Sequence, residues 1–349
     1  MRMANIGIDL QMISRPQLTG MGRYISELLP RFRDYKDFNW VELKPKPIKF
    51  YRTIWEHTVL PLSLIAKGVN LLFCPANIAP IWIPWGVKTI LTVHDVRVKV
   101  FPETFSKGTR AYYEFLYSAT LHRVDRIITV SEFSKNEIIK YFPETKNKIT
   151  VIYEAIDTNK FKFLNLPREK QIMMLGAIAK HKNVLNTLKA FSLVVNEIPH
   201  KLIIVGSKDS GLPIEEEVNE VLEKIPSDRV IFTGKLSDEE IIELYNKSEF
   251  FVFPSLYEGF GFPPLEAMAC GCPVIVSYIS SLPETVGDAG LFVDPYKPED
   301  IASKMVLIAS NQELRNELRE KGFERVKNFS WSKAAKEHVD VFKEVLNEV

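Results

Sequence analysis

Two glutamates, Glu258 and Glu266, frame a stretch that contains two glycines and two prolines. The glycines, Gly259 and Gly261, allow the main chain to turn sharply and to come close to a ligand. Residues 250–254 form an apolar run typical of a buried strand, and the prolines after the glycines favour the first turn of a helix. The stretch therefore predicts a strand, a loop and a helix, and the start of such a helix attracts anions.

The donors at this anion site are restricted, because Pro263 and Pro264 have no N–H group. The remaining main-chain donors are those of Phe260, Gly261, Phe262, Leu265 and Glu266. Two carboxylates aimed at a phosphate would repel it, so Glu258 and Glu266 are better suited to accept hydrogen bonds from hydroxyl groups on either side. A diphosphate flanked by two polyols is a nucleotide sugar. The residues alone leave a second interpretation open, in which the glutamates cap a helix or face solvent in an ordinary buried strand–helix–strand unit.

The sequence EGFGFPPLEAMACGCPVI resembles the signature of retaining glycosyltransferases with the GT-B fold, in the large family four that includes bacterial and archaeal mannosyltransferases. The resemblance implies an α/β protein with two facing Rossmann-like domains, each a doubly wound parallel sheet, and a cleft between them. It implies that Glu258 binds the hexose hydroxyls and Glu266 the ribose hydroxyls. It further implies donor contacts at Gly259, Phe260, Gly261, Phe262 and Leu265.

The composition is that of a globular protein with room for two domains. The chain has 349 residues, of which 46% are hydrophobic and 26% charged, and its net charge is +1. This charge balance argues against a nucleic-acid partner. Three cysteines are too few for a disulfide framework, and Cys270 and Cys272 are expected to be buried thiols. Without a signal-peptide pattern or a run long enough to cross a bilayer, the sequence predicts a cytoplasmic protein.

A second glycine-bearing stretch lies near the start of the chain. Residues 5–10 predict a strand, residues 11–22 a loop and residues 23–32 a helix. A G-x-G sequence is by itself weak support for a nucleotide site. The sequence TGMGRYISELL resembles the first glycine loop of the same family, which faces the diphosphate and the acceptor across the cleft. The resemblance implies donor contacts at Gly20, Gly22 and Arg23.

His94 follows a predicted strand at residues 89–93 and stands at the carboxyl edge of a parallel sheet. Taken alone, its pairing with Asp95 is more often structural than catalytic. The sequence TVHDV followed by FPETFS resembles the inner face of the family's first domain, which implies that His94 lies close to the transferred sugar. His94 would orient a donor or acceptor hydroxyl, or relay a proton, since imidazole titrates near neutrality.

The strand–helix alternation restarts after a polar, proline-containing stretch at residues 167–170. We expect an acceptor domain at residues 1–165, a nucleotide-sugar-binding domain at 166–330, and a final helix at 331–349 that, by resemblance, returns to the first domain. Before this boundary, Glu154-Ala155 stands where the family usually has Asn-Gly, so a main-chain contact that needs that glycine is in doubt.

The segment GAIAKHKN follows a predicted strand and carries Lys180, His181 and Lys182. Cations in a partly dry cleft would hold a diphosphate, whereas an exposed basic loop is the alternative. The family commonly has Arg-Lys-Asn here, so the resemblance implies phosphate binding by Lys182 and leaves the role of His181 open. By the same resemblance, Gly234 and Lys235 lie against the nucleoside base.

Together these features predict transfer of a hexose, mannose from GDP-mannose, to a hydroxyl of a polysaccharide or lipid-linked glycan. The resemblance implies retention at the anomeric carbon, with His94, Lys182 and Glu258 as catalytic residues and an oxocarbenium-like transition state. No Asp-x-Asp sequence is placed to hold a metal, so we expect neither a metal nor another cofactor. UDP-glucose enzymes share every motif, which leaves the donor open, and the acceptor cannot be read. A nucleotide-sugar isomerase and a non-catalytic sugar-nucleotide-binding subunit are the alternatives from other classes.

Residues 44–55 mix cations, aromatic residues and prolines, and Trp82 and Trp85 add a second aromatic cluster. This composition suits a surface that touches anionic lipid headgroups. A solvated loop with some aromatic side chains packed inward is the alternative. Peripheral contact with the inner face of a membrane is therefore a hypothesis.

Overall fold

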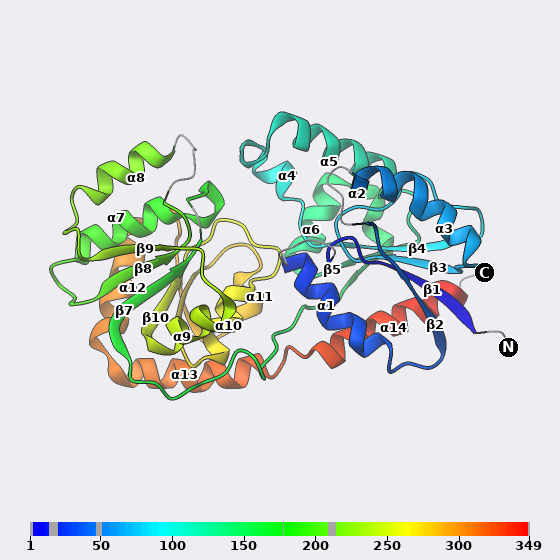
Figure 1. Cartoon of the computed structure of the whole chain (residues 1–349). Coiled ribbons are helices and arrows are strands. Elements are labelled where there is room, and N and C mark those ends of the chain that lie inside the picture. Colours follow the sequence, from blue (N-terminus) through cyan, green and yellow to red (C-terminus); the bar gives the residue numbers. More distant parts are fainter. Residues whose placement is uncertain (1–2, 14–19, 47–50, 177, 209–213, 348–349) are drawn as a thin grey trace. The chain divides into compact units, whose positions relative to one another are not determined.

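The computed structural model describes residues 3–13, 20–46, 51–176, 178–208 and 214–347. The chain forms two compact units (Figure 1), residues 1–155 with 330–349 and residues 156–329. The chain therefore passes from the first unit to the second at residue 155, ten residues before the boundary that we expected. Residues 330–349 belong to the first unit.

The sheet of the first unit is parallel, with the strand order β2-β1-β3-β4-β5-β6. Its central strands are nearly continuous apolar runs, as expected for strands that are covered on both faces. All four residues of β3 are buried, and so are the last five of β4. The strands are β1 (Ala4–Asp9), β2 (Phe38–Leu43), β3 (Leu71–Cys74), β4 (Lys88–Val93), β5 (Arg126–Thr129) and β6 (Ile149–Val151).

Helices lie on both faces of this sheet (Figure 1). One core joins the strands to α3 and α5, through residues such as Leu60, Leu72 and Tyr117. On the other face, Phe73 of β3 packs against Phe342 of α14, with ring centroids 5.2 Å apart. The helical elements are α1 (Gly20–Phe32), α2 (Tyr51–Ile54), η1 (Trp55–Val59), α3 (Leu60–Ala66), α4 (Arg97–Val100), η2 (Pro102–Thr104), α5 (Lys107–Thr120), α6 (Glu132–Tyr141), η3 (Pro143–Lys148) and α14 (Trp331–Asn347).

The start of α1 differs from the prediction. We expected a loop up to residue 22, but the helix already begins at Gly20. Glycine is tolerated at a helix start, where its conformational freedom costs little. The predicted loop residues 14–19 lie outside the described residues.

The second unit contains another parallel sheet, in the order β12-β11-β10-β7-β8-β9. Its core packs strand residues such as Ile204 and Val252 against Phe191 of α7 and Met305 of α12. The strands are β7 (Glu169–Leu175), β8 (Lys201–Val205), β9 (Val230–Gly234), β10 (Ser248–Phe253), β11 (Val274–Ser277) and β12 (Gly290–Val293). The helical elements are η4 (Lys180–Lys182), α7 (Val184–Val194), α8 (Ile214–Leu222), α9 (Asp238–Lys247), α10 (Phe262–Ala269), α11 (Leu282–Val286), α12 (Pro298–Ser310) and α13 (Gln312–Val326).

The two parallel sheets confirm the predicted α/β class with two Rossmann-like domains. The linker predicted at residues 167–170 is wrong in its second half, because β7 begins at Glu169. These polar residues occupy the exposed end of the strand, where Lys170 pairs with Glu249 at 2.7 Å. None of the helices in the described ranges is long and apolar enough to cross a membrane.

Candidate functional site

The loop between β10 and α10 is held by two hydroxyl groups from the start of α11. Ser281 donates to the main-chain oxygens of Glu258 (3.0 Å) and Phe260 (2.7 Å), and Thr285 also donates to Phe260 (2.5 Å). A trans peptide directs the N–H of the next residue away from the carbonyl oxygen, and the described peptide bonds include no cis bond. The N–H groups of the glycines after Glu258 and Phe260 therefore point away from α11. This arrangement suits an anion.

Gly261 meets two requirements that other residues do not satisfy. Its φ angle of 114° lies in the region that side chains rarely adopt, and an added Cβ would lie 2.9 Å from Leu282 Cδ2. α10 begins directly after it, with Pro263 and Pro264 in the first turn. Because the N–H of the fourth helical residue, Leu265, belongs to the helix's own bonding, the predicted donors concentrate at residues 259–262.

Lys182 and Glu258 form an ion pair of 2.7 Å between Nζ and Oε1. Ser255 donates a second hydrogen bond of 2.6 Å to the same carboxylate oxygen. Burial opposes the charge of Glu258, but Lys182, Ser255 and the nearby His181 outweigh it and lower the pKa of this carboxyl group. The Lys182 ammonium also lies 5.0 Å from the ring centroid of Phe253.

Main-chain contacts bring these two side chains together. The carbonyl oxygen of His181 accepts hydrogen bonds from the N–H of Leu256 (2.8 Å) and the hydroxyl of Ser255 (2.9 Å). Asn183 donates from its amide to the carbonyl oxygen of Pro254 at 2.9 Å. The segment that carries Lys182 is thus fixed against the loop after β10. Sequence reasoning missed Ser255, although a serine directly after an apolar strand is a signal that could have found it.

Glu266 is buried on α10. Its Oε2 atom lies 3.4 Å from the hydroxyl of Tyr245 on α9, a long hydrogen bond. Burial raises the pKa of Tyr245 well above its ordinary value, and the charge of Glu266 adds to this shift. Tyr245 is therefore a neutral donor that helps to hold the Glu266 carboxylate.

Gly234 ends β9 with a φ angle of 71°, and the exposed Lys235 follows it. In the sheet, β7 and β8 separate β9 from β10, which carries the Glu258 loop. The structure therefore places Gly234 and Lys235 at the same sheet edge as the Lys182–Glu258 pair but does not join them to it directly. Their contact with a nucleoside base stays a prediction.

In the first unit, His94 has hydrogen bonds at every polar atom. Its N–H donates to Asn77 Oδ1 (2.7 Å), and its carbonyl oxygen accepts from Ser134 (3.1 Å). The ring atom Nδ1 lies 2.9 Å from Glu154 Oε1, and Nε2 lies 2.9 Å from the carbonyl oxygen of Pro75. Both His94 and Glu154 are buried. Sequence reasoning identified Glu154 only as a departure from the family pattern.

Tyr24 connects His94 to the final helix. The edge of one ring faces the other, with centroids 4.8 Å apart. The Tyr24 hydroxyl lies 3.2 Å from Thr92 Oγ1 and 2.5 Å from Nε2 of His338 on α14. Burial lowers the pKa of His338 to about 4, and the charge of His94 contributes to this shift. His338 is therefore neutral and accepts the tyrosine proton, while its Nδ1 donates to the carbonyl oxygen of Ala334.

Gly20, Gly22 and Arg23 occupy the first turn of α1. An added Cβ at Gly20 would meet no atom within 4 Å, so no packing within the described residues requires this glycine. These residues and His94 belong to the first unit, whereas Lys182 and Glu258 belong to the second. That both sets contact one donor stays a prediction.

Across the part of the chain that the structure describes, no group of three His, Cys, Asp or Glu side chains gathers in a way that could hold a metal ion. Cys74, Cys270 and Cys272 are buried free thiols. The prediction of buried thiols is confirmed.

Comparison with known proteins gives consistent results over most of the chain. The sequence profile of Glycosyltransferase Family 4 matches residues 20–160, and that of Glycosyl transferases group 1 matches residues 155–325. The chain is 30% identical over 268 residues to the O-antigen chain mannosyltransferase B of Escherichia coli, covering 73% of this chain and 70% of that protein.

It is 31% identical over 283 residues to the MMP alpha-(1->4)-mannosyltransferase of Mycolicibacterium hassiacum, covering 76% of this chain and 67% of that protein. Among solved structures, a sucrose-phosphate synthase from Thermosynechococcus elongatus matches 99% of this chain and 100% of its own, with a TM-score of 0.77 and 20% identity. This last similarity concerns the fold alone.

Proposed function

The chain belongs to the family-four glycosyltransferases with the GT-B fold, and we propose that it transfers mannose from GDP-mannose to an acceptor hydroxyl with retention at the anomeric carbon. The acceptor is proposed to be a growing polysaccharide or a lipid-linked glycan. Two relatives at 30% and 31% identity carry the name mannosyltransferase, and one of them acts on an O-antigen chain. The observation that carries the proposal is the Lys182–Glu258 pair beside the glycine loop.

The leaving diphosphate is proposed to bind between Lys182 and the main chain at residues 259–262. As the glycosidic bond breaks, negative charge grows on the departing phosphate, and fixed donors in a partly dry site stabilise it. A lysine ammonium has three N–H donors, so Lys182 can contact a phosphate oxygen while one donor stays on Glu258. Glu258 then accepts hydrogen bonds from hexose hydroxyls with its remaining lone pairs.

The nucleoside part is proposed to bind along the same sheet edge. Glu266 would accept hydrogen bonds from the two ribose hydroxyls, since a buried carboxylate favours such donors over bulk water. Gly234 and Lys235 would border the base. His181 contributes its main-chain carbonyl to the loop geometry, as its two hydrogen bonds to residues 255 and 256 indicate.

The transition state is proposed to resemble an oxocarbenium ion, with the acceptor attacking from the face that the diphosphate leaves. The departing phosphate would help to take the acceptor proton, so that no separate enzymic nucleophile is required. We also propose that transfer needs no bound metal. Activity that is retained after dialysis against EDTA supports this, and activity restored only by Mg²⁺ or Mn²⁺ contradicts it.

Product analysis with four donors tests the function. The full chain is incubated with GDP-mannose, UDP-glucose, GDP-glucose or UDP-N-acetylglucosamine and a lipid-linked or oligosaccharide acceptor. We expect GDP release that the acceptor accelerates, and an α-mannosylated product whose anomeric configuration is read by NMR coupling. Preferential use of UDP-glucose assigns a glucosyltransferase, altered free sugar assigns an isomerase, and binding without turnover assigns a non-catalytic subunit.

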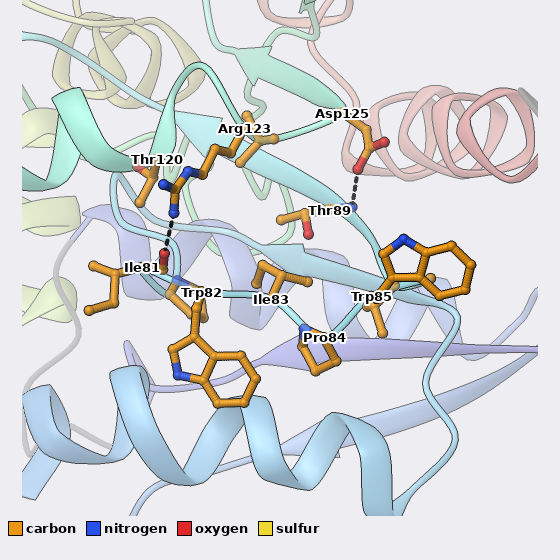
Figure 2. Close-up of a pocket in the computed structure, with 13 residues that line it drawn as sticks. Ile81, Trp82, Ile83, Pro84, Trp85, Thr89, Thr120, Arg123 and Asp125 are labelled. Carbon is orange, nitrogen blue, oxygen red and sulfur yellow. Dashed lines mark hydrogen bonds between the residues drawn. The ribbon is translucent and has the colours of Figure 1, made fainter.

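Contact with an anionic membrane is proposed for one surface of the first unit. Trp85 is fully exposed and Trp82 is 41% exposed, on the loop before β4 (Figure 2). Trp82 donates from its indole N–H to the carbonyl oxygen of His57, which joins this loop to η1. Ile54, Leu62 and Ile65 are also exposed on the helical segment around η1. Tryptophan and aliphatic side chains of this kind insert into the headgroup region of a bilayer.

The loop itself is well supported. Figure 2 shows Arg123 donating to the carbonyl oxygen of Ile81 (2.9 Å) and Asp125 accepting from the N–H of Thr89 (2.8 Å). These contacts line a pocket of about 340 Å³ beneath the loop. Of the cationic stretch that we predicted at residues 44–55, residues 47–50 lie outside the described residues.

Flotation with vesicles tests this contact. The wild type is expected to float with phosphatidylglycerol-containing vesicles, and a Trp82→Ser/Trp85→Ser variant is expected to lose most of this binding. Leu193→Ser provides a matched control, because Leu193 is an exposed apolar residue of the second unit. Equal flotation of wild type and double variant contradicts the proposed surface.

A further inference from the structure

The two ring nitrogens of His94 both face oxygen atoms. The carbonyl oxygen of Pro75 only accepts hydrogen bonds, so Nε2 at 2.9 Å must carry a proton. At Nδ1 the partner is Glu154 Oε1, also at 2.9 Å. If Glu154 is ionised, Nδ1 carries a proton and the ring is an imidazolium. If Glu154 is protonated instead, the pair still contains the same extra proton.

The groups around His94 favour this extra proton. Burial is the largest influence and opposes the charged ring, but the hydrogen bond and charge of Glu154, the Pro75 carbonyl and the charge of Asp95 together raise the pKa of His94. From α1, Tyr24 presents a ring whose own pKa is raised by burial, so it is neutral. From α14, His338 is neutral as well. Glu154 is therefore the main charge that compensates the ring.

We propose that Glu154 is a positioning residue that keeps His94 protonated and holds its ring between the loops after β3 and β6. This inference rests on the proposed transfer function and assigns His94 the role of a fixed cationic support instead of a base. A general base needs a nitrogen with a free lone pair. In this arrangement His94 gains one only if it leaves Glu154 or Pro75.

The geometry shows what the pair supports. Pro75 follows β3, His94 follows β4 and Glu154 lies beyond β6, while the sheet order in this region is β3-β4-β5-β6. The side chains of Asn77 and Ser134 bind the main chain of His94 on either side. The His94 ring thus connects loops from both sides of β4 at the carboxyl edge of the sheet, which is where open parallel sheets bind their ligands.

Nitrogen-15 NMR of labelled histidine in the full chain tests the protonation directly. The chain has six histidines, and a His94→Gln variant assigns the relevant signals. At about pH 7.5 we expect both His94 ring nitrogens at the chemical shift of the protonated form. A Glu154→Gln variant keeps the size of the side chain, and its amide group can donate to an unprotonated Nδ1.

In Glu154→Gln the titration midpoint of His94 is therefore expected to fall by about one pH unit or more. Glu137→Gln is the matched control, because Glu137 pairs with Lys140 on α6 and leaves His94 untouched. A neutral His94 ring in the wild type, or an unchanged midpoint in Glu154→Gln, overturns the inference. If Glu154→Gln does not fold, the wild-type spectrum alone decides.

The pH dependence of kcat/KM separates positioning from a purely structural role. In the wild type we expect no loss of activity as the pH rises through about 6.5, the ordinary pKa of histidine. In Glu154→Gln we expect activity to fall in that range and to recover at least fivefold when the pH is lowered. A pH-independent loss in the variant contradicts the inference. A protonated His94 in a chain that transfers no sugar supports the pairing and contradicts only the proposed function.

Discussion

Each unit of the molecule carries one cation–glutamate pair at the carboxyl edge of its sheet, and the two pairs differ in exposure. The side chains of Lys182 and Glu258 are 21% and 15% exposed and 2.7 Å apart. Those of His94 and Glu154 are 9% and 4% exposed and 2.9 Å apart. The first pair borders a loop that suits an anion, whereas the second is enclosed by its own protein.

The number of donors explains why the two pairs suit different tasks. An ammonium group on a flexible stem has three donors and can add a ligand oxygen without giving up its glutamate. A histidine ring has two nitrogen atoms, and in His94 each already faces an oxygen. The Lys182 pair is thus suited to contact a ligand, and the His94 pair is suited to hold loops in place.

The largest effect is expected when the Lys182 pair is broken from its cationic side. Lys182→Ala should lower kcat by about a hundredfold to a thousandfold, the usual consequence of losing one donor to a developing negative charge. The effect on KM for the donor should be smaller, because the benefit grows as the bond breaks. Steady-state kinetics at saturating donor measure this.

Lys170→Ala is the control, since Lys170 forms a pair of the same length with Glu249 at the opposite edge of the same sheet. This variant should keep nearly full activity. An unchanged kcat in Lys182→Ala would rule out its role at the leaving group.

Glu266→Ala tests whether the ligand contacts extend along α10. Loss of one charged hydrogen-bond partner should weaken GDP binding by about 1.5–3 kcal/mol. Isothermal titration calorimetry with GDP gives the value, and Glu299→Ala on α12 serves as a control carboxylate at a distant helix start. If GDP binds Glu266→Ala as tightly as the wild type, the ribose assignment is wrong.

The two pairs should also stabilise the fold in different pH ranges. The raised pKa of His94 means that its stabilisation is complete below about pH 6.5 and is lost as the pH rises through the folded-state value. The lowered pKa of Glu258 means that its stabilisation is present above about pH 4.3 and is lost as the pH falls through the folded-state value.

Urea unfolding as a function of pH measures both effects, each expected at about 1 kcal/mol for a shift of one pH unit. Glu154→Gln should flatten the alkaline side alone, and Glu258→Gln the acidic side alone. A variant that flattens both sides would show that the pairs are not independent.

The smallest effects are expected from single hydroxyl groups that hold the main chain beside each pair. Thr285→Val removes one hydrogen bond to Phe260 and should reduce stability by about 1 kcal/mol and weaken GDP binding severalfold. Ser134→Ala removes the corresponding bond to His94 and should reduce stability alone. Thermal unfolding with and without GDP compares the two, and weakened GDP binding in Ser134→Ala would contradict the division of roles.

Elements with strong local signals could be predicted from the sequence. The helix α9 has the predicted bounds, and Ser131 caps α6 by accepting from the N–H of Ser134 at 3.0 Å, as expected. The apolar run at residues 250–254 is β10, and Gly271 has the positive φ angle that a helix end favours. In each case the neighbouring residues alone determine the conformation.

The pairing of site residues could not be predicted, because it depends on contacts between distant segments. Lys182 reaches Glu258 across 76 positions, and only the hydrogen bonds of His181 with residues 255 and 256 fix that approach. The engagement of both His94 nitrogens depends on loops after β3 and β6. The sequence identified the chemistry of these side chains but not their partners.

The return of α14 to the first unit has a consequence for synthesis on the ribosome. Phe342 and His338 pack against Phe73 and Tyr24, so the core of the first unit contains residues from near both ends of the described chain. The segment 1–155 leaves the ribosome first, yet it lacks these side chains until the whole second unit has been translated. During that interval an apolar face between α1 and β3 is uncovered. The nascent first unit is therefore a substrate for chaperones that bind exposed apolar surface.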